Sequence, residues 1–159
     1  MKNKKIVYID MDGVLVDLVG AVYKKYTHAL GDDEFNVGKL IDRDVEPFYD
    51  AEPIPGAVEA FNQLSSDPRF EVYILSTAPW ANPESLTAKR VWAEQHLGKE
   101  ANRRLIFTHN KSLMIGDYLV DDRPNNGASG FKGKLIKFGS KEYPDWTSVL
   151  TKIKHDVEL

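Results

Sequence analysis

Short apolar runs alternate along the chain with stretches in which apolar residues recur every three or four positions. Runs that are nearly continuous in apolar residues predict strands buried on both faces, whereas the longer amphipathic stretches predict helices. This alternation is typical of an α/β fold, a doubly wound, Rossmann-like parallel sheet with helices packed against it. The strands are expected at residues 6–9, 71–75, 104–107, 118–120 and 135–138.

The helices between these strands have recognisable ends. Residues 56–66 and 83–97 predict two of them, and in the second Asn82 is a candidate N-cap, Pro83 lies in the first turn and Gly98 ends the helix. A last helix is expected after a candidate cap at Asp145, with its apolar residues on one face: Val149, Leu150 and Ile153.

Residues 18–53 do not fit this alternation. They are too many for one connection between a strand and a helix, and they end in the proline-rich turn Glu52-Pro-Ile-Pro-Gly56. We interpret residues 18–53 as a small helical cap inserted after the first strand, which leaves residues 1–17 and 54–159 as the α/β core. The first cap helix is predicted from Leu18 to Leu30 with Asp17 as N-cap. Its apolar contacts are expected from Phe35, Leu40, Ile41, Phe48 and Tyr49.

Composition narrows the possible functions. A chain of 159 residues, 42% hydrophobic and 28% charged, predicts one folded unit and excludes a disordered chain. With 21 basic and 24 acidic side chains the net charge is −3, so we expect no nucleic-acid polymer and no membrane as partner. The basic N-terminus is followed too soon by aspartates to be a signal sequence, which predicts a cytoplasmic location. The chain contains no cysteine, so a metal would be held by oxygen or imidazole ligands.

Polar side chains follow four of the predicted strands. Because the carboxyl ends of parallel strands meet at one edge of a sheet, these side chains are expected to lie together. Carboxylates crowded at such an edge repel one another unless a cation neutralises them, and oxygen ligands of this kind suit Mg²⁺. The four groups are Asp10-Met-Asp12-Gly13, Ser76-Thr77, Thr108-His109-Asn110-Lys111 and Asp121-Asp122.

These motifs resemble those of a known superfamily. The segment Ile9-Asp-Met-Asp-Gly-Val-Leu-Val-Asp17 resembles the first motif of the haloacid dehalogenase-like hydrolases, and the later motifs follow in the family's order: Leu75-Ser-Thr77, Lys111 and Leu119-Val-Asp-Asp122. More narrowly, the chain is similar to the 5'(3')-deoxyribonucleotidases in three further segments: Glu52-Pro-Ile-Pro-Gly-Ala57, Ser76-Thr-Ala-Pro79 and Val120-Asp-Asp-Arg-Pro124.

The resemblance implies a role for each motif. Asp10 would attack phosphorus and form an aspartyl phosphate, while Asp12 would protonate the leaving group and then deprotonate the attacking water. Asp10, the backbone carbonyl of Asp12 and Asp122 would bind Mg²⁺, with Asp121 next to this set rather than in it. Three further groups would bind the phosphoryl oxygens: the Thr77 hydroxyl, the Ala78 amide and the Lys111 ammonium.

The expected substrate is a small phosphomonoester, most specifically a nucleotide. Trp80, which follows the Thr77 loop, is the candidate for contact with the base, and the opposite wall would come from Leu18, Phe48 and Tyr49. Ordinary packing between the cap and the core is the alternative role for these aromatic residues. The oligomeric state is not predicted.

Other interpretations stay open at this point. Asp10, Asp12 and Gly13 could form a simple turn, and Lys111 could be an ordinary surface charge. A signalling receiver domain also uses carboxylates, a threonine and a lysine around Mg²⁺, but its acidic pair is adjacent and it has no cap. A binding protein that has lost activity, or a phosphatase of another metabolite such as a sugar phosphate, would share the fold.

Overall fold

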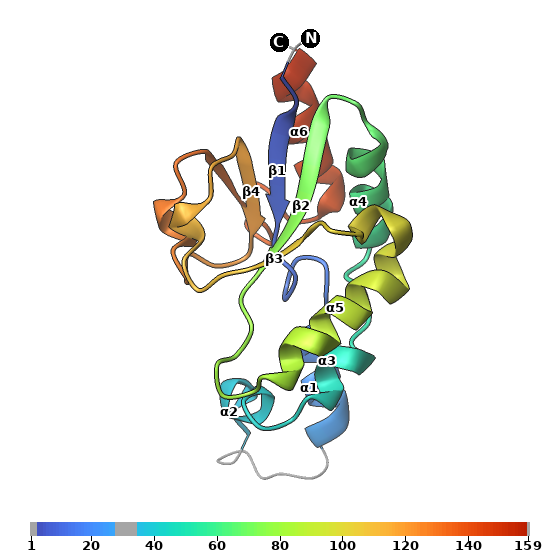
Figure 1. Ribbon diagram of the computed structural model, residues 1–159, viewed down its shortest axis with the longest axis vertical. Helices are drawn as coiled ribbons and strands as arrows, with labels where there is room; N and C mark the ends of the chain where they lie inside the picture. The colour runs from blue at the N-terminus through green and yellow to red at the C-terminus, as the bar shows by residue number, and fades with distance from the viewer. Residues whose placement is uncertain (1–2, 28–34, 159) are drawn as a thin grey trace.

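The computed structural model describes residues 3–27 and 35–158, and its centre is a parallel sheet (Figure 1). The five strands found in these ranges pair in the order β3-β2-β1-β4-β5, and every pair is parallel. Each end lies within one residue of its predicted position, which confirms the α/β class. The strands are β1 (Lys5–Ile9), β2 (Phe70–Ser76), β3 (Leu105–Phe107), β4 (Tyr118–Asp121) and β5 (Lys134–Lys137).

The strand order places β1 in the middle of the sheet. From β1 the chain moves outward to β2 and β3, then returns to the other side of β1 to form β4 and β5. The ends of β1 and β4 therefore lie side by side where the order reverses, with Ile9 opposite Val120. In sheets of this kind, ligands bind beyond the carboxyl ends of the strands at this point. Asp10 and Asp121 lie at these two strand ends.

Side chains alternate along each strand between two differently covered faces. One face, which includes Val7, Ile9 and Ile74, packs against three helices: α4 (Ala57–Ser66), α5 (Glu84–Leu97) and α6 (Trp146–Glu158). The other, which includes Tyr8 and Leu119, packs against two segments that each contain a short 3₁₀ turn, η2 (Lys111–Leu113) and η3 (Ala128–Gly130). Because the connections after β3 and β4 are short, 3₁₀ turns cover the face where a doubly wound fold usually has helices.

The predicted ends of α5 are partly correct. Gly98 ends the helix with a φ of +64°, as expected. The prediction that Asn82 is its N-cap is wrong, because Pro83 occupies that position. The Asn82 side chain instead donates a hydrogen bond from Nδ2 to the carbonyl oxygen of Ile41 at 2.8 Å, so a tertiary contact replaces the local one.

The last helix begins and packs as predicted. The Asp145 carboxylate accepts a hydrogen bond from the Ser148 amide at 2.9 Å, the geometry of an N-cap. Val149 and Ile153 are fully buried against the sheet, with Leu150 partly buried beside them.

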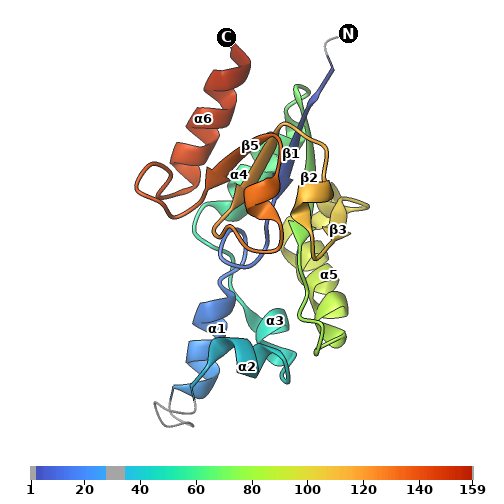
Figure 2. The same cartoon turned by 90° about the vertical axis from the view of Figure 1, so that its left-hand side faces the viewer.

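The described residues of the segment interpreted as a cap form three short helices at the end of the molecule opposite to the start of β1 (Figures 1 and 2). These are α1 (Leu18–Tyr26), α2 (Val37–Ile41) and α3 (Glu46–Asp50). Asp17 caps α1, as predicted, by accepting a hydrogen bond from the Gly20 amide at 2.9 Å. The helix ends at Tyr26, and the predicted last residues up to Leu30 fall in 28–34, outside the described residues.

These helices pack against α5 and against one another. Leu18 of α1 and Phe48 of α3 are buried together with Ala88 of α5. Leu40 is also buried, and the rings of Tyr23 and Phe35 lie 4.6 Å apart. Tyr49, which was expected to join these apolar contacts, is exposed and is not part of this buried cluster.

Two stretches of chain connect this insertion to the sheet, and they are hydrogen-bonded to each other. The Asp17 amide donates to the Glu52 carbonyl, and the Ile54 amide donates to the Leu15 carbonyl, both at 2.9 Å. These hydrogen bonds join the two connecting stretches, residues 14–17 and 51–54, which we call the stem of the insertion.

Two buried indoles hold this stem in place. Trp146 of α6 donates from Nε1 to the Val14 carbonyl at 2.9 Å, and Trp92 of α5 donates from Nε1 to the Ala51 carbonyl at 2.7 Å. Each of the two connecting stretches is thus hydrogen-bonded to a different helix that packs against the sheet.

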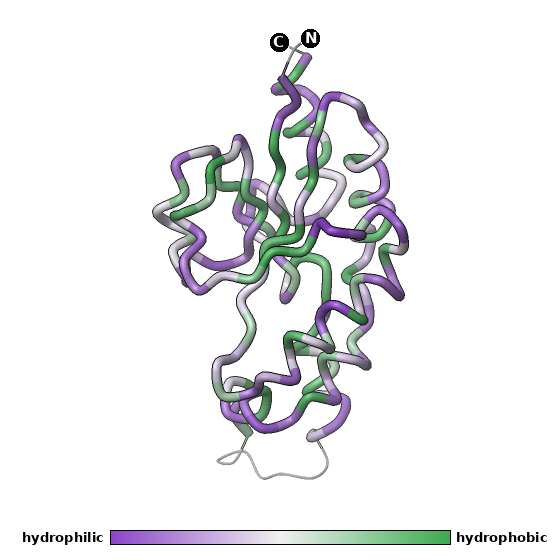
Figure 3. Tube along the Cα trace, in the orientation of Figure 1, coloured by the Kyte–Doolittle hydropathy of each residue, from purple (hydrophilic) through white to green (hydrophobic). Residues whose placement is uncertain are grey.

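Hydropathy along the chain follows this arrangement (Figure 3). Apolar residues concentrate where the strands run together, and polar residues appear on the outer turns of the helices. None of the helices within 3–27 and 35–158 combines the length and the apolar character that crossing a membrane requires.

Candidate active site

The turn after β1 sets the position of the first two aspartates. The Met11 carbonyl accepts hydrogen bonds from the amides of Val14, Leu15 and Val16, so the chain turns sharply at this point. Gly13 has a φ of +81°, a backbone conformation that residues other than glycine rarely adopt. A Cβ atom on Gly13 would also lie 2.2 Å from Oδ2 of Asp122. Glycine is therefore required both by the backbone and by the neighbouring carboxylate.

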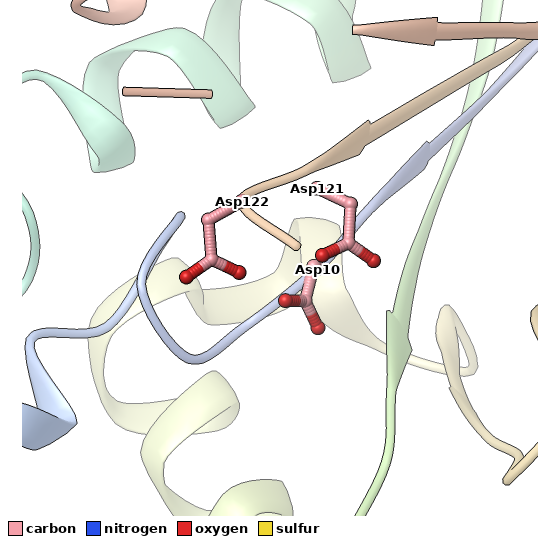
Figure 4. A group of neighbouring side chains, drawn as sticks. All are labelled: Asp10, Asp121 and Asp122. Atoms are coloured by element: carbon pink, nitrogen blue, oxygen red, sulfur yellow. The ribbon is translucent and has the colours of Figure 1, made fainter. Parts of the chain in front are cut away.

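Three carboxylates meet beyond the ends of β1 and β4 (Figure 4). Asp10, Asp121 and Asp122 each contribute an oxygen, and these oxygens lie within 4.8 Å of one another. Asp10 and Asp121 are 8% and 3% exposed. The Oδ1 atom of Asp122 is buried without a hydrogen-bond partner among the described residues. A buried carboxylate oxygen is costly in that state, so the donor set fits a hard cation such as Mg²⁺.

Lys111 provides a positive charge in this group. Its Nζ atom lies 3.0 Å from Oδ1 of Asp10 and 2.6 Å from Oδ2 of Asp121. The Lys111 backbone is held by a hydrogen bond from its amide to the Asn126 carbonyl at 2.7 Å. Gly127, with a φ of +78°, permits the close approach, since a Cβ atom there would lie 2.9 Å from the Lys111 nitrogen.

The balance of charge shifts the protonation of these groups. Burial raises the pKa of Asp10 to about 8; the nearby Lys111 opposes this shift, and Asp121 and Asp12 add to it. Burial also raises the pKa of Asp122. For Lys111, burial lowers the pKa, but the attraction of Asp10 and Asp121 outweighs it and the net shift is upward. A bound divalent cation would favour the ionised carboxylates that the protein alone disfavours.

Asp12 is held by a residue that sequence analysis missed. Its Oδ2 atom accepts a hydrogen bond from Nζ of Lys89 at 2.6 Å, and the same ammonium donates to Oγ of Ser76 at 2.9 Å. Lys89 lies on α5 and is 1% exposed. The sequence does contain a signal for this contact, because Lys89 shares a helix face with the buried residues Ser85 and Trp92. A lysine on a buried face requires a charged or polar partner.

A small pocket of about 40 Å³ lies among these groups. One water needs about 10–15 Å³, so the pocket has room for a few atoms of that size, such as a cation and phosphoryl oxygens. Thr77 lines the pocket, and its hydroxyl donates a hydrogen bond to the Thr108 carbonyl at 2.7 Å. Ala78, the next residue, is buried. Three lining residues were not singled out from the sequence: Arg123, Asn125 and Asn126.

Trp80 lies outside this pocket and is 88% exposed. Its ring packs edge-on against His109, with 5.9 Å between the ring centroids. The expectation that Leu18 and Phe48 form an opposite wall is wrong, because both are buried in the contact between the insertion and α5. Tyr49 is 38% exposed. Core packing, the alternative considered for these positions, accounts for Leu18 and Phe48.

A larger hollow of about 900 Å³ lies elsewhere, between α5, β3 and the 3₁₀ turn η1 (Gly98–Ala101). Its lining includes Leu86, Arg90 and Phe107 but none of the carboxylates described above. The chemistry of the side chains, not the size of the hollow, identifies the candidate active site.

Solved structures share this architecture. A magnesium-bound haloacid dehalogenase-like hydrolase from Bacillus subtilis, YfnB, aligns with a TM-score of 0.59 at 11% identity, covering 99% of this chain and 100% of that one. A hydrolase of the same class from Deinococcus radiodurans, with bound phosphate and sodium, gives a TM-score of 0.54 at 16% identity, covering 94% and 88%. The chain thus has the fold of the haloacid dehalogenase-like hydrolases.

Sequence relatives narrow the class. Residues 40–150, more than half of the chain, match the family model for 5' nucleotidase, deoxy (pyrimidine), cytosolic type C protein. A Vibrio phage KVP40 protein named "Putative 5'(3')-deoxyribonucleotidase" is 46% identical over 94% of this chain and 84% of its own length. The human 5'(3')-deoxyribonucleotidase, cytosolic type, is 32% identical over 70% of this chain and 50% of its own. The chain belongs to this nucleotidase family.

Proposed function

We propose that the protein is a Mg²⁺-dependent phosphatase that hydrolyses deoxyribonucleoside or ribonucleoside 5'- or 3'-monophosphates through an aspartyl-phosphate intermediate. The observation that supports this most is the cluster of Asp10, Asp121 and Asp122 oxygens within 4.8 Å of one another. Lys111 contacts two of these carboxylates. The proposed nucleophile Asp10, the carboxylates that would bind Mg²⁺ and the positively charged Lys111 then lie in one place, as phosphoryl transfer requires.

The metal would be held by Asp10, the backbone carbonyl of Asp12, and Asp122. Asp122 has a buried oxygen without a partner among the described residues, which supports its role as a ligand. Asp121 instead accepts hydrogen bonds from the Lys111 ammonium and, at 3.1 Å, from the Arg123 amide, so its role is to hold Lys111. Mg²⁺ would supply electrostatic stabilisation of the charge on the phosphoryl oxygens.

The reaction has two displacements at phosphorus. In the first, a carboxylate oxygen of Asp10 forms a bond to phosphorus while the bond to the nucleoside oxygen breaks, and Asp12 gives its proton to that oxygen. In the second, a water oxygen attacks the aspartyl phosphate while Asp12 takes the water proton. The products are inorganic phosphate and the free Asp10 carboxylate, and Asp12 is again protonated.

Three groups would bind the phosphoryl oxygens. The Lys111 ammonium already lies 3.0 Å from the nucleophile, so it reduces the repulsion between Asp10 and the anionic substrate. The Thr77 hydroxyl borders the pocket and would donate to substrate by rotating away from the Thr108 carbonyl. The Ala78 amide follows on the same loop. Donors fixed at strand ends need little rearrangement during the reaction.

A nucleoside is the proposed leaving group because of the relatives' names and the position of Trp80. This side chain is 88% exposed next to the loop that carries Thr77. A large exposed ring at that position offers a stacking surface for a base, a contact typically worth about 1–3 kcal/mol. His109 supports the ring from the side.

Phosphate release from a panel of substrates tests the reaction. We expect release from 5'- and 3'-(deoxy)nucleoside monophosphates in Mg²⁺, and none in EDTA or with Asp10→Asn. Asp145→Asn is a matched control, because asparagine also caps a helix and Asp145, the N-cap of α6, does not line the pocket. Release that persists in EDTA or in Asp10→Asn would contradict the mechanism.

The same panel tests the choice of substrate. If sugar phosphates are preferred over nucleotides, the mechanism stands and the nucleotidase assignment does not. Trp80→Ala should lower kcat/KM for nucleotides about 5- to 100-fold while changing that for ribose 5-phosphate less than about threefold. Equal losses for both substrates would show that Trp80 does not contact the base.

A further inference from the structure

Lys89 is an unusual residue for its location. It is 1% exposed in the middle of α5, yet it carries a charge that burial strongly disfavours. Its Nζ atom is 2.6 Å from Oδ2 of Asp12 and 2.9 Å from Oγ of Ser76. The contact with Asp12 joins residues that are 77 positions apart in the sequence.

An apolar side chain would fill this position without the cost of desolvating an ammonium group. Buried ion pairs often contribute little net stability compared with well-packed apolar residues of similar size. The Lys89–Asp12 pair is therefore poorly explained as a stabilising device alone, and its location next to the proposed acid and base suggests a role in the reaction.

We propose that Lys89 is a positioning residue that fixes the carboxylate of Asp12 for proton transfer. This inference rests on the proposed function. Lys89 holds the Oδ2 atom, so Oδ1 is the oxygen that exchanges a proton with the leaving group and then with water. Ser76 holds the ammonium from β2, so the Asp12 side chain is oriented by two elements of the core.

The insertion completes this arrangement. The ring centroid of Phe48, on α3, lies 5.5 Å from Nζ of Lys89. Phe48 is 2% exposed, and it packs in the same buried cluster as Ala88, the neighbour of Lys89 on α5. The aromatic face favours a cation at this distance and leaves the ammonium little room to turn away from Asp12. The insertion thus contributes to the orientation of a residue in the core.

A leaving-group comparison separates positioning from other roles. A nucleoside alkoxide needs a proton as it departs, whereas p-nitrophenolate departs readily without one. Lys89→Met should therefore lower kcat/KM for a deoxynucleoside monophosphate about 100-fold or more, and that for p-nitrophenyl phosphate less than about threefold. Since kcat/KM reports only steps up to formation of the phosphoenzyme, the second half-reaction does not affect this comparison.

The second displacement supplies another readout. It needs Asp12 as a base with either substrate, so Lys89→Met should show a burst of p-nitrophenolate, close to one per enzyme, followed by slow turnover. In an Asp12→Asn background, Lys89→Met should cause no further loss, because the residue acts through Asp12. Lys99→Met, on an exposed part of the chain, is the control and should behave as wild type.

A second variant, Ser76→Ala, distinguishes a loss of positioning from a loss of activity that comes only from misfolding of Lys89→Met. Ser76→Ala keeps the Lys89 charge but removes one of its two oxygen partners, and should give a smaller loss of the same kind, about 3- to 10-fold for the nucleotide only. Equal losses for the two substrates, or a rise in KM for both, would overturn the inference and show that Lys89 binds the phosphoryl group or only supports the fold. If wild type hydrolyses neither substrate, the proposed function fails and this inference fails with it.

Discussion

Gly13 and Asp122 come so close that a single added carbon would collide with the carboxylate. A Cβ atom on Gly13 would be 2.2 Å from Oδ2 and 2.8 Å from Cγ of Asp122. The glycine belongs to the turn after β1, and the aspartate follows β4. The contact therefore sets the spacing between the two strand ends on which the candidate metal site is built.

Gly13→Ala should accordingly disturb both stability and activity. The left-handed backbone alone should lower the free energy of unfolding by about 1–2 kcal/mol, and the collision should displace Asp122 and weaken Mg²⁺ binding. Gly139→Ala is a matched control, because Gly139 has a φ of +79° but nothing within 4 Å of its added carbon. Urea unfolding and Mg²⁺ titration of phosphate release measure both effects. Equal Mg²⁺ dependence in the two variants would count against the role given to this contact.

Lys111→Met should leave two buried carboxylates facing each other without a cation from the protein. Lys111 contacts both Asp10 and Asp121 and is 3% exposed. Removing one partner from a buried ion pair typically costs about 3–5 kcal/mol, and the loss should shrink at low pH because Asp10, whose pKa is raised, becomes protonated. Urea unfolding at two pH values checks this. A variant as stable as wild type at neutral pH would show that the pairs contribute little.

The metal-free protein should become less stable as the pH rises. Asp10 has an ordinary pKa of 3.8 and a pKa of about 8 in the folded chain. A raised carboxyl pKa means that its contribution to stability is complete below about pH 4 and is lost as the pH rises to about 8. Unfolding in EDTA between about pH 5 and pH 8 should show this fall, and Asp10→Asn should make it shallower.

Added Mg²⁺ should oppose this loss. The cation binds the ionised carboxylates of the folded state, so its stabilising effect should grow with pH. Identical pH profiles with and without Mg²⁺ would contradict a metal bound at Asp10.

The two indoles that hold the stem of the insertion should each contribute measurably to stability. Trp92→Phe and Trp146→Phe keep most of the apolar volume but leave the carbonyls of Ala51 and Val14 without their donors. Each change should cost about 1–3 kcal/mol in thermal or urea unfolding. Trp80→Phe is the control, since an exposed substitution of this kind typically changes stability by less than about 0.5 kcal/mol. Losses no larger than those of the control would indicate that water replaces the indole.

The sheet was predictable because it depends on local pattern. Buried parallel strands such as β1 and β2 read as continuous apolar runs, and their ends were correct to within one residue. The grouping of Asp10, Lys111 and Asp121 at one edge followed from the same reasoning, since parallel strands bring their carboxyl ends together.

What the sequence did not reveal depends on contacts between distant segments. Asn82 has the side chain of an N-cap, but its hydrogen bond goes to Ile41, a partner known only once the insertion is placed. Leu18 and Phe48 appeared suitable for a substrate wall, and their burial against α5 depends on how the insertion packs. Lys89 was overlooked for the same reason, because its partners Asp12 and Ser76 lie on other elements.

Because β1 lies in the middle of the sheet, the residues that surround its end come from segments far along the chain. Asp10 precedes its lysine partner by 101 residues, and the indole that fixes the neighbouring turn is 132 residues from its acceptor. Chains generally fold from the N-terminal part during synthesis, and pairings between distant residues form slowly. The surroundings of Asp10 are therefore complete only when these distant segments are present: a product truncated before β4 keeps Asp10, Asp12, Lys89 and Lys111 but lacks Asp121, Asp122 and the Trp146 indole.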